Sequence, residues 1–161
     1  MNGAAFAGGV LALAAAALVP AEPLAVHLVA HGLIVSVAAP LLALAAPPLR
    51  VPAVLAWGGF VATMWVVHVP EPHTGAAAHL ALLAASLAFW LAVLALDGPR
   101  RVLMLLTAMP AADLAALWLM ANGEPTAGAV MTASSLPMGA AIVAAAWTWL
   151  QAEERAATLA E

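Results

Sequence analysis

Histidine is the residue type in this chain whose spacing best suits chemistry. His27 and His31 stand four residues apart, so on a helix both imidazoles share one face. His68, His73 and His79 follow within the short stretch WVVHVPEPHTGAAAH, which also holds two prolines and a glutamate. Imidazole nitrogen is a common ligand for copper, zinc and haem iron. The pattern therefore indicates a candidate metal or haem site.

A structural use of the same histidines stays open on spacing alone. A histidine near a helix end often caps a carbonyl or anchors the helix at the level of the lipid headgroups. However, two imidazoles on one face of a membrane helix are costly to desolvate unless they share a partner. A metal ion is the simplest partner that two nitrogen ligands can share.

Methionine is the second soft ligand type. Met120 and Met131 are expected near the outer face, at the level of the histidines, whereas most other methionines are expected to fill helical cores. The chain has no cysteine, which excludes disulfides and thiolate ligation. Histidine with methionine suits Cu(I) and histidine alone suits Cu(II), whereas zinc more often has a carboxylate or thiolate beside it.

Two carboxyl groups are candidates for a part in such a site. Asp113 is the acid expected near mid-membrane, where a carboxylate is a functional candidate by default. Alternatively, it is a protonated group bonded to a neighbouring helix through Thr107, Ser134 or Ser135. Glu71, which lies between two prolines, could ligate a metal or accept a hydrogen bond from a histidine, although a surface acid needs no such role.

The composition predicts which elements position these residues. Hydrophobic residues make up 66% of the 161-residue chain, charged residues make up 7%, and the mean hydropathy is +1.08. One soluble domain could not keep so much apolar surface out of water, and helices satisfy their own backbone groups in hydrocarbon. We therefore predict a single all-α domain over residues 1–161, a polytopic membrane helix bundle of about six transmembrane helices. The predicted spans are residues 3–19, 24–45, 53–69, 76–96, 102–120 and 127–150.

The arginines orient this predicted bundle. All of them fall on one side of the membrane, in the connections after the second and fourth spans and after the sixth span: Arg50, Arg100, Arg101 and Arg155. The positive-inside bias predicts that this side is cytoplasmic, with both termini there. The five histidines then lie in the outer part of the bundle.

Two further features of the sequence bear on targeting and on partners. The first span ends in ALVPAEP, which resembles a signal-peptide cleavage site, but the preceding MNG carries no basic residue, so we expect a retained helix. The net charge of −4 makes no basic patch, which argues against nucleic acid as a partner.

Five segments of the chain carry a family resemblance when they are taken in order. They are HLVAHGLIVSVAAPLLALAAPPLR, MWVVHVPEP, HLALLAASLAFW, GEPTAGAVMTASSLPMGAA and WTWLQAEERA. Together they resemble the bacterial multi-spanning CtaG family of cytochrome c oxidase assembly factors over about residues 24–156. The matching positions are His27, His31, Pro40, His68, Pro70, His79, Trp90, Gly128, Met131 and residues 149–155. The chain departs from the family in being shorter and in carrying GEPT and Thr132 beside the A-G-x-x-M motif.

The resemblance implies a copper-binding protein of the bacterial inner membrane, not an enzyme, that faces the periplasm and helps to deliver copper to the oxidase. Its partners would be the lipid bilayer and either a copper-accepting oxidase subunit or a periplasmic copper chaperone. On this basis we expect His27 and His31 as core ligands, His68 and His79 as closing ligands, and auxiliary or delivery residues at His73 and Met131. Two alternatives stay open, a b-type haem protein and a small structural subunit or copper transporter.

Overall fold

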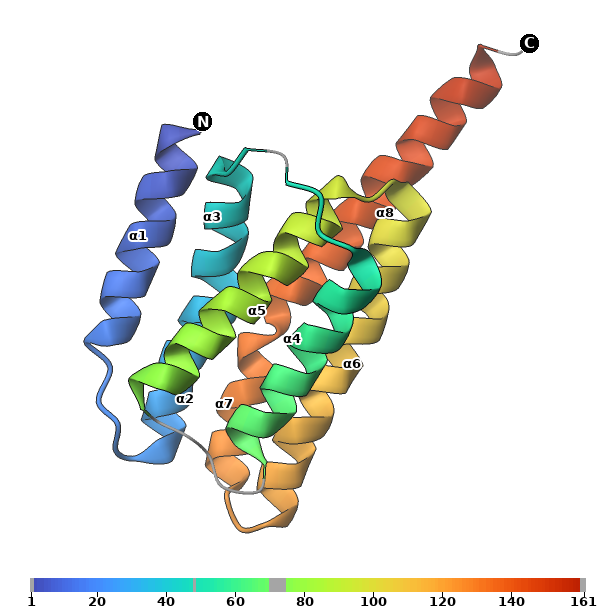
Figure 1. Cartoon of the computed structure of the whole chain (residues 1–161). Coiled ribbons are helices and arrows are strands. Elements are labelled where there is room, and N and C mark those ends of the chain that lie inside the picture. The colour runs from blue at the N-terminus through green and yellow to red at the C-terminus, as the bar shows by residue number, and fades with distance from the viewer. Residues whose placement is uncertain (1, 48, 70–74, 160–161) are drawn as a thin grey trace.

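The computed structural model describes residues 2–47, 49–69 and 75–159, and their regular secondary structure is entirely helical (Figure 1). The helices form six continuous segments, so the predicted all-α bundle is confirmed. The segments are α1 (Gly3–Ala17); α2 (Leu24–Leu33) continuing through η1 (Ile34–Ala38) into α3 (Ala39–Ala45); α4 (Ala53–His68); α5 (Ala76–Ala95); α6 (Gly98–Ala121); and α7 (Pro125–Ser134) followed by α8 (Leu136–Thr158). Four of these segments are long and apolar enough to cross a membrane, namely Leu24–Ala45, Ala76–Ala95, Gly98–Ala121 and Pro125–Thr158. The protein is thus a helical membrane protein, in which α1 and α4 are shorter apolar helices.

Two helices extend beyond their predicted spans. Helix α6 begins at Gly98 because the Asp97 carboxylate caps it, accepting a hydrogen bond from the backbone N–H of Arg100 at 3.4 Å. Pro99 fits this first turn, where its missing N–H costs nothing. Helix α8 continues to Thr158 instead of ending near residue 150, because its last residues are good helix formers that need no apolar surroundings.

The connections gather at two ends of the bundle. Figure 1 shows the N-terminus, the turn from α5 to α6 and the C-terminus toward one end, whereas the connections from α1 to α2 and from α6 to α7 lie at the other. The residues Arg50, Arg100, Arg101 and Arg155 belong to the first end. There Arg101 donates to the carbonyls of Val93, Leu94 and Leu96, which closes the C-terminus of α5.

Small residues let the helices around the candidate site approach one another closely. A Cβ atom on Gly32 of α2 would lie 2.7 Å from the Cβ of Ser134 in α7. A Cβ atom on Gly128 of α7 would lie 2.5 Å from the carbonyl oxygen of Ala116 in α6. In membrane bundles close van der Waals packing of this kind is a principal source of helix association.

The π-helical turn η1 has an identifiable cause one turn after His31. The N–H of Ala39 donates to the carbonyl of Ile34, five residues back, and the same register would pair residue 40 with the carbonyl of Val35. Pro40 has no N–H to give. The indole N–H of Trp90, from α5, instead donates to the Val35 carbonyl at 3.0 Å. This bond satisfies a carbonyl that would otherwise be orphaned and ties α5 to η1.

At the break between α7 and α8, a backbone carbonyl is likewise satisfied by a side chain from another helix. Pro137 lies in the first turn of α8, and the N–H of Met138 donates to the carbonyl of Ser135, which leaves the Ser134 carbonyl free of that bond. The Ser36 hydroxyl, from η1, donates to this carbonyl at 2.6 Å. Two irregular turns therefore face each other in the middle of the bundle, each close to the histidines.

Candidate metal centre

Three histidines from two helices converge at one end of the bundle. His27 and His31 lie one turn apart on α2, and His79 lies in the first turn of α5. One ring nitrogen from each of the three lies within 4.8 Å of those of the other two. The Nε2 atoms of His27 and His79 are 3.2 Å apart, and their rings stack with centroids 4.9 Å apart. The imidazoles of His27 and His31 are buried, and that of His79 is half-buried.

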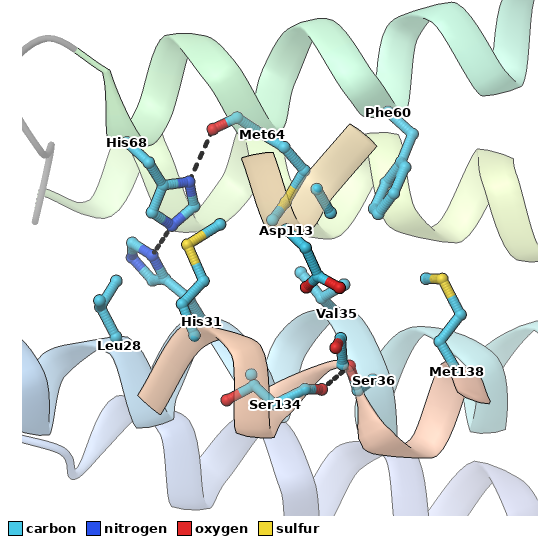
Figure 2. Close-up of a pocket in the computed structure, with 14 residues that line it drawn as sticks. Leu28, His31, Val35, Ser36, Phe60, Met64, His68, Asp113, Ser134 and Met138 are labelled. Atoms are coloured by element: carbon cyan, nitrogen blue, oxygen red, sulfur yellow. Dashed lines mark hydrogen bonds between the residues drawn. The ribbon is translucent and has the colours of Figure 1, made fainter. Parts of the chain in front are cut away.

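His68 adds a fourth imidazole from a third helix. It is the last residue of α4 and is fully buried, and its Nε2 lies 2.9 Å from Nδ1 of His31. The two ring centroids are 5.0 Å apart (Figure 2). The structure thus brings His27, His31, His68 and His79 into one cluster, in which His31 touches each of the other three rings.

The position of one proton can be followed through the His68 side of this cluster. Nδ1 of His68 donates to the carbonyl of Met64 at 2.7 Å, so in a neutral ring its Nε2 holds a lone pair. That lone pair accepts the hydrogen of His31 Nδ1. Nε2 of His31 is therefore the ring nitrogen with the free lone pair, and it is buried without a hydrogen-bond partner. A buried unsatisfied acceptor is costly, and binding a cation would satisfy it.

The His27 side is arranged by a second backbone carbonyl. Nδ1 of His27 donates to the carbonyl of Pro20 at 3.3 Å, which leaves the lone pair on Nε2, toward His79. Metal-binding histidines characteristically donate their other ring N–H to a carbonyl or carboxylate, which fixes the tautomer and the ring orientation. His27 meets this condition directly, and His31 meets it through His68.

A partly open cavity of about 30 Å³ lies beside the cluster. His31 and His68 form part of its wall, and the Asp113 side chain points into it from α6 (Figure 2). Met131, expected as an auxiliary ligand, is buried and also lines this cavity. The other lining residues are Leu28, Gly32, Val35, Ser36, Phe60, Met64, Ala112, Ser134, Ser135 and Met138.

Of the three hydroxyls considered as partners for Asp113, those of Ser134 and Ser135 line the same cavity, and the Ser135 hydroxyl donates to the carbonyl of Thr132 at 2.7 Å. The hydroxyls of Thr107 and Ser134 donate to carbonyls of their own helices. Asp113 itself is half-buried. His73 and Glu71 lie outside the described residues.

Some elements of the site could not be found in the sequence. The Met64 carbonyl is four residues before His68, which is a common partner for a histidine at a helix end, but nothing marks the Pro20 carbonyl. The cavity-lining roles of Met64 and Met138 also had no sequence signal, because core methionines at helical spacing look alike.

The fold and this cluster define a helical membrane protein with a histidine site able to hold a metal ion. No family model, curated protein or solved structure matches the chain. The resemblance to the CtaG family therefore depends on the motifs in the sequence.

Proposed function

We propose that this chain is a copper-binding membrane protein that assists copper delivery to cytochrome c oxidase, and the assembly of that enzyme, at the outer face of a bacterial inner membrane. The observation that carries the proposal is the convergence of one ring nitrogen each from His27, His31 and His79 within 4.8 Å. The resemblance to the CtaG family supplies the oxidase as the destination. The four arginines lie at the opposite end of the bundle. The proposal takes that end as cytoplasmic, which places the histidine cluster at the outer face.

The ligand chemistry favours copper among the common metals. Among the described residues the group that could hold an ion consists of imidazoles alone, with neither thiolate nor carboxylate. Zinc sites usually include one of those groups, whereas imidazole suits copper in either oxidation state. Met131 in the adjoining cavity adds a thioether, a ligand that selects Cu(I).

The packing of the rings favours an ion over haem. The centroids of neighbouring imidazoles in the cluster are 4.9 to 5.1 Å apart, so the rings touch one another. A haem with two histidine ligands must place its macrocycle between the two rings. The cavity beside the cluster, at about 30 Å³, is far too small for a macrocycle.

The burial of the histidines suits both the holding and the release of copper. His27 and His31 are buried and oriented by hydrogen bonds, so they provide the fixed part of the site. His79 is half-buried at the start of α5 and provides the accessible part, from which ligands exchange with an acceptor. Ligand exchange makes and breaks no covalent bond in a substrate, which agrees with a non-enzymatic role.

Metal analysis of the protein purified without a His-tag tests this proposal. We expect copper in the wild-type protein and its loss from the double variant His27→Ala, His79→Ala, with an unchanged helical circular dichroism spectrum. In the native host, deletion of the gene should lower the copper content of cytochrome c oxidase, and the wild-type gene should restore it while the double variant should not. A Soret band, or zinc in place of copper, would contradict the proposal. Uptake of copper into proteoliposomes would identify a transporter instead.

A further inference from the structure

Three methionines from three helices meet at the cavity beside the histidine cluster. Met64 belongs to α4, Met131 to α7 and Met138 to α8, and all three line the cavity. Their exposed fractions are 6%, 7% and 2%, so their thioethers are shielded from the surroundings of the protein. Figure 2 shows Met64 and Met138 extending toward the cavity from opposite helices. Thioether sulfur is a ligand for soft monovalent ions, Cu(I) above all.

The cavity and the histidine cluster share a wall. His31 and His68 line the cavity and also belong to the cluster. Of these two residues, His31 is the one in ring contact with all three other imidazoles. An ion held by His31 would thus lie at the wall of the cavity that the thioethers also line.

Asp113 supplies a charge to the same cavity. It belongs to the membrane-spanning helix α6, and its carboxyl group faces the space between Met64, Met138 and Ser36 (Figure 2). The residues that line the cavity include neither lysine nor arginine. A carboxyl in such surroundings needs either a proton or a cation, and a monovalent cation beside the carboxylate gives a neutral pair.

We propose that this cavity is a second, inner copper site, in which the thioethers of Met64, Met131 and Met138 bind one Cu(I) ion and Asp113 provides the counter-charge. The proposal rests on the proposed function and extends it, because the ion reaches the cavity by way of His31, which belongs to the cluster and lines the cavity. A volume of about 30 Å³ holds one small ion or about two waters, which limits the site to a single ion. No electron transfer is involved, because copper enters and leaves as Cu(I), and the proton that leaves Asp113 balances the charge.

The experiment is an anaerobic titration of the full chain with Cu(I), and in parallel with Ag(I), against a competing chelator, followed by X-ray absorption at the copper edge. We expect two equivalents in the wild-type protein, with sulfur scattering that appears with the second. The double variant Met64→Leu, Met138→Leu should lose the second equivalent and the sulfur signal, and its affinity for the first should change less than about threefold. Leucine conserves the volume of these side chains, so the fold should persist. Met104→Leu, on α6, is the matched control, because Met104 is equally buried but lies outside this cavity.

The outcomes separate this inference from the proposed function. One equivalent with nitrogen scattering only, unchanged in the methionine variant, would overturn the inner site and leave the histidine site in place; the three methionines would then be core packing. Absence of binding in the wild-type protein would overturn both proposals. A second equivalent with sulfur scattering that survives in the Met64→Leu, Met138→Leu variant would place the site at other sulfur atoms and would also overturn the inference.

Discussion

Nδ1 of His31 and Nε2 of His68 lie 2.9 Å apart, although the two residues are 37 positions apart in the sequence and belong to different helices. Because the Met64 carbonyl takes the Nδ1 hydrogen of His68, the contact between the two rings has a single hydrogen, and His31 donates it. His68 therefore fixes the tautomer and the orientation of His31. At the proposed three-histidine site we therefore expect His31 to be a ligand and His68 to position it, in place of the closing-ligand role expected for His68 from the sequence.

Substitutions of His31 and His68 should have different effects on copper binding. His31→Ala should abolish most copper binding, because it removes a ligand. His68→Ala should lower the affinity by about 10- to 100-fold, the usual effect of losing an outer partner of a metal ligand. His68→Gln should restore part of that loss, because its side-chain oxygen can accept the His31 hydrogen. Competition with a chelator of known copper affinity measures all three.

The double variant His31→Ala, His68→Ala provides the check on this assignment. It should bind copper no more weakly than His31→Ala alone, since residues that act through one another are strongly non-additive. Stoichiometric copper in the double variant would show that the histidines are helix-end anchors and do not form a metal site.

Substitution of His73 should change the rate of copper transfer more than the equilibrium affinity for copper. The residue belongs to the segment between α4 and α5, outside the described residues, and we expect it to act in delivery. His73→Ala should leave the copper affinity within about threefold of the wild type and slow the transfer to an acceptor, measured by stopped-flow with a chromogenic Cu(I) chelator. Equal transfer rates in the two proteins would remove His73 from the delivery path.

The fold was largely predictable from the sequence. The length of an apolar run, and the proline and charged residues that flank it, determine where a membrane helix begins and ends. The spans predicted for residues 24–45 and 76–96 agree with Leu24–Ala45 and Ala76–Ala95 to within a residue. Pro40 and Pro137 were visible in the sequence, but the turns they produce were not, because each depends on a distant donor. Those donors, Trp90 and Ser36, could be matched to their carbonyls only in three dimensions.

The site was predictable in its residue types and less so in its pairings. The spacing of His27 and His31 placed both on one face, and the short connection after His68 brought His79 to the same end of the bundle. Which ring nitrogen faces which depends on side-chain rotamers and on backbone carbonyls, and sequence spacing contains neither. The division of the site into a histidine cluster and a separate cavity that contains Met131 follows from helix packing alone.

Asp113→Asn separates charge from hydrogen bonding in the cavity. The amide keeps both donor and acceptor capacity, so the fold should persist. If the carboxylate is the counter-charge of an inner ion, the second equivalent of Cu(I) or Ag(I) should bind about 10-fold or more weakly, while the first is unchanged. Unchanged binding of both equivalents would show that Asp113 is only a bonding group between helices.

Trp90→Phe tests the energetic role of the indole hydrogen bond at the π-helical turn. The variant removes the donor to the Val35 carbonyl, which is buried and which Pro40 cannot satisfy. We expect a loss of about 1 kcal/mol in the free energy of unfolding, the usual scale for an interhelical hydrogen bond in a membrane bundle. Titration with a denaturing detergent, followed by circular dichroism, measures it. Trp149→Phe is the control, because the Trp149 indole bonds only to Glu153 on the surface of its own helix.

The proposed orientation of the bundle can be tested with single cysteines in a chain that has none of its own. Ala21 lies in the exposed connection between α1 and α2, at the end that contains the histidines, and Leu49 is exposed in the connection before α4, at the arginine end. In intact cells with a permeable outer membrane, a membrane-impermeant thiol reagent should label Ala21→Cys and leave Leu49→Cys unlabelled until the inner membrane is disrupted. The reverse pattern would place the histidine cluster on the cytoplasmic side and would contradict a role in delivering copper at the outer face.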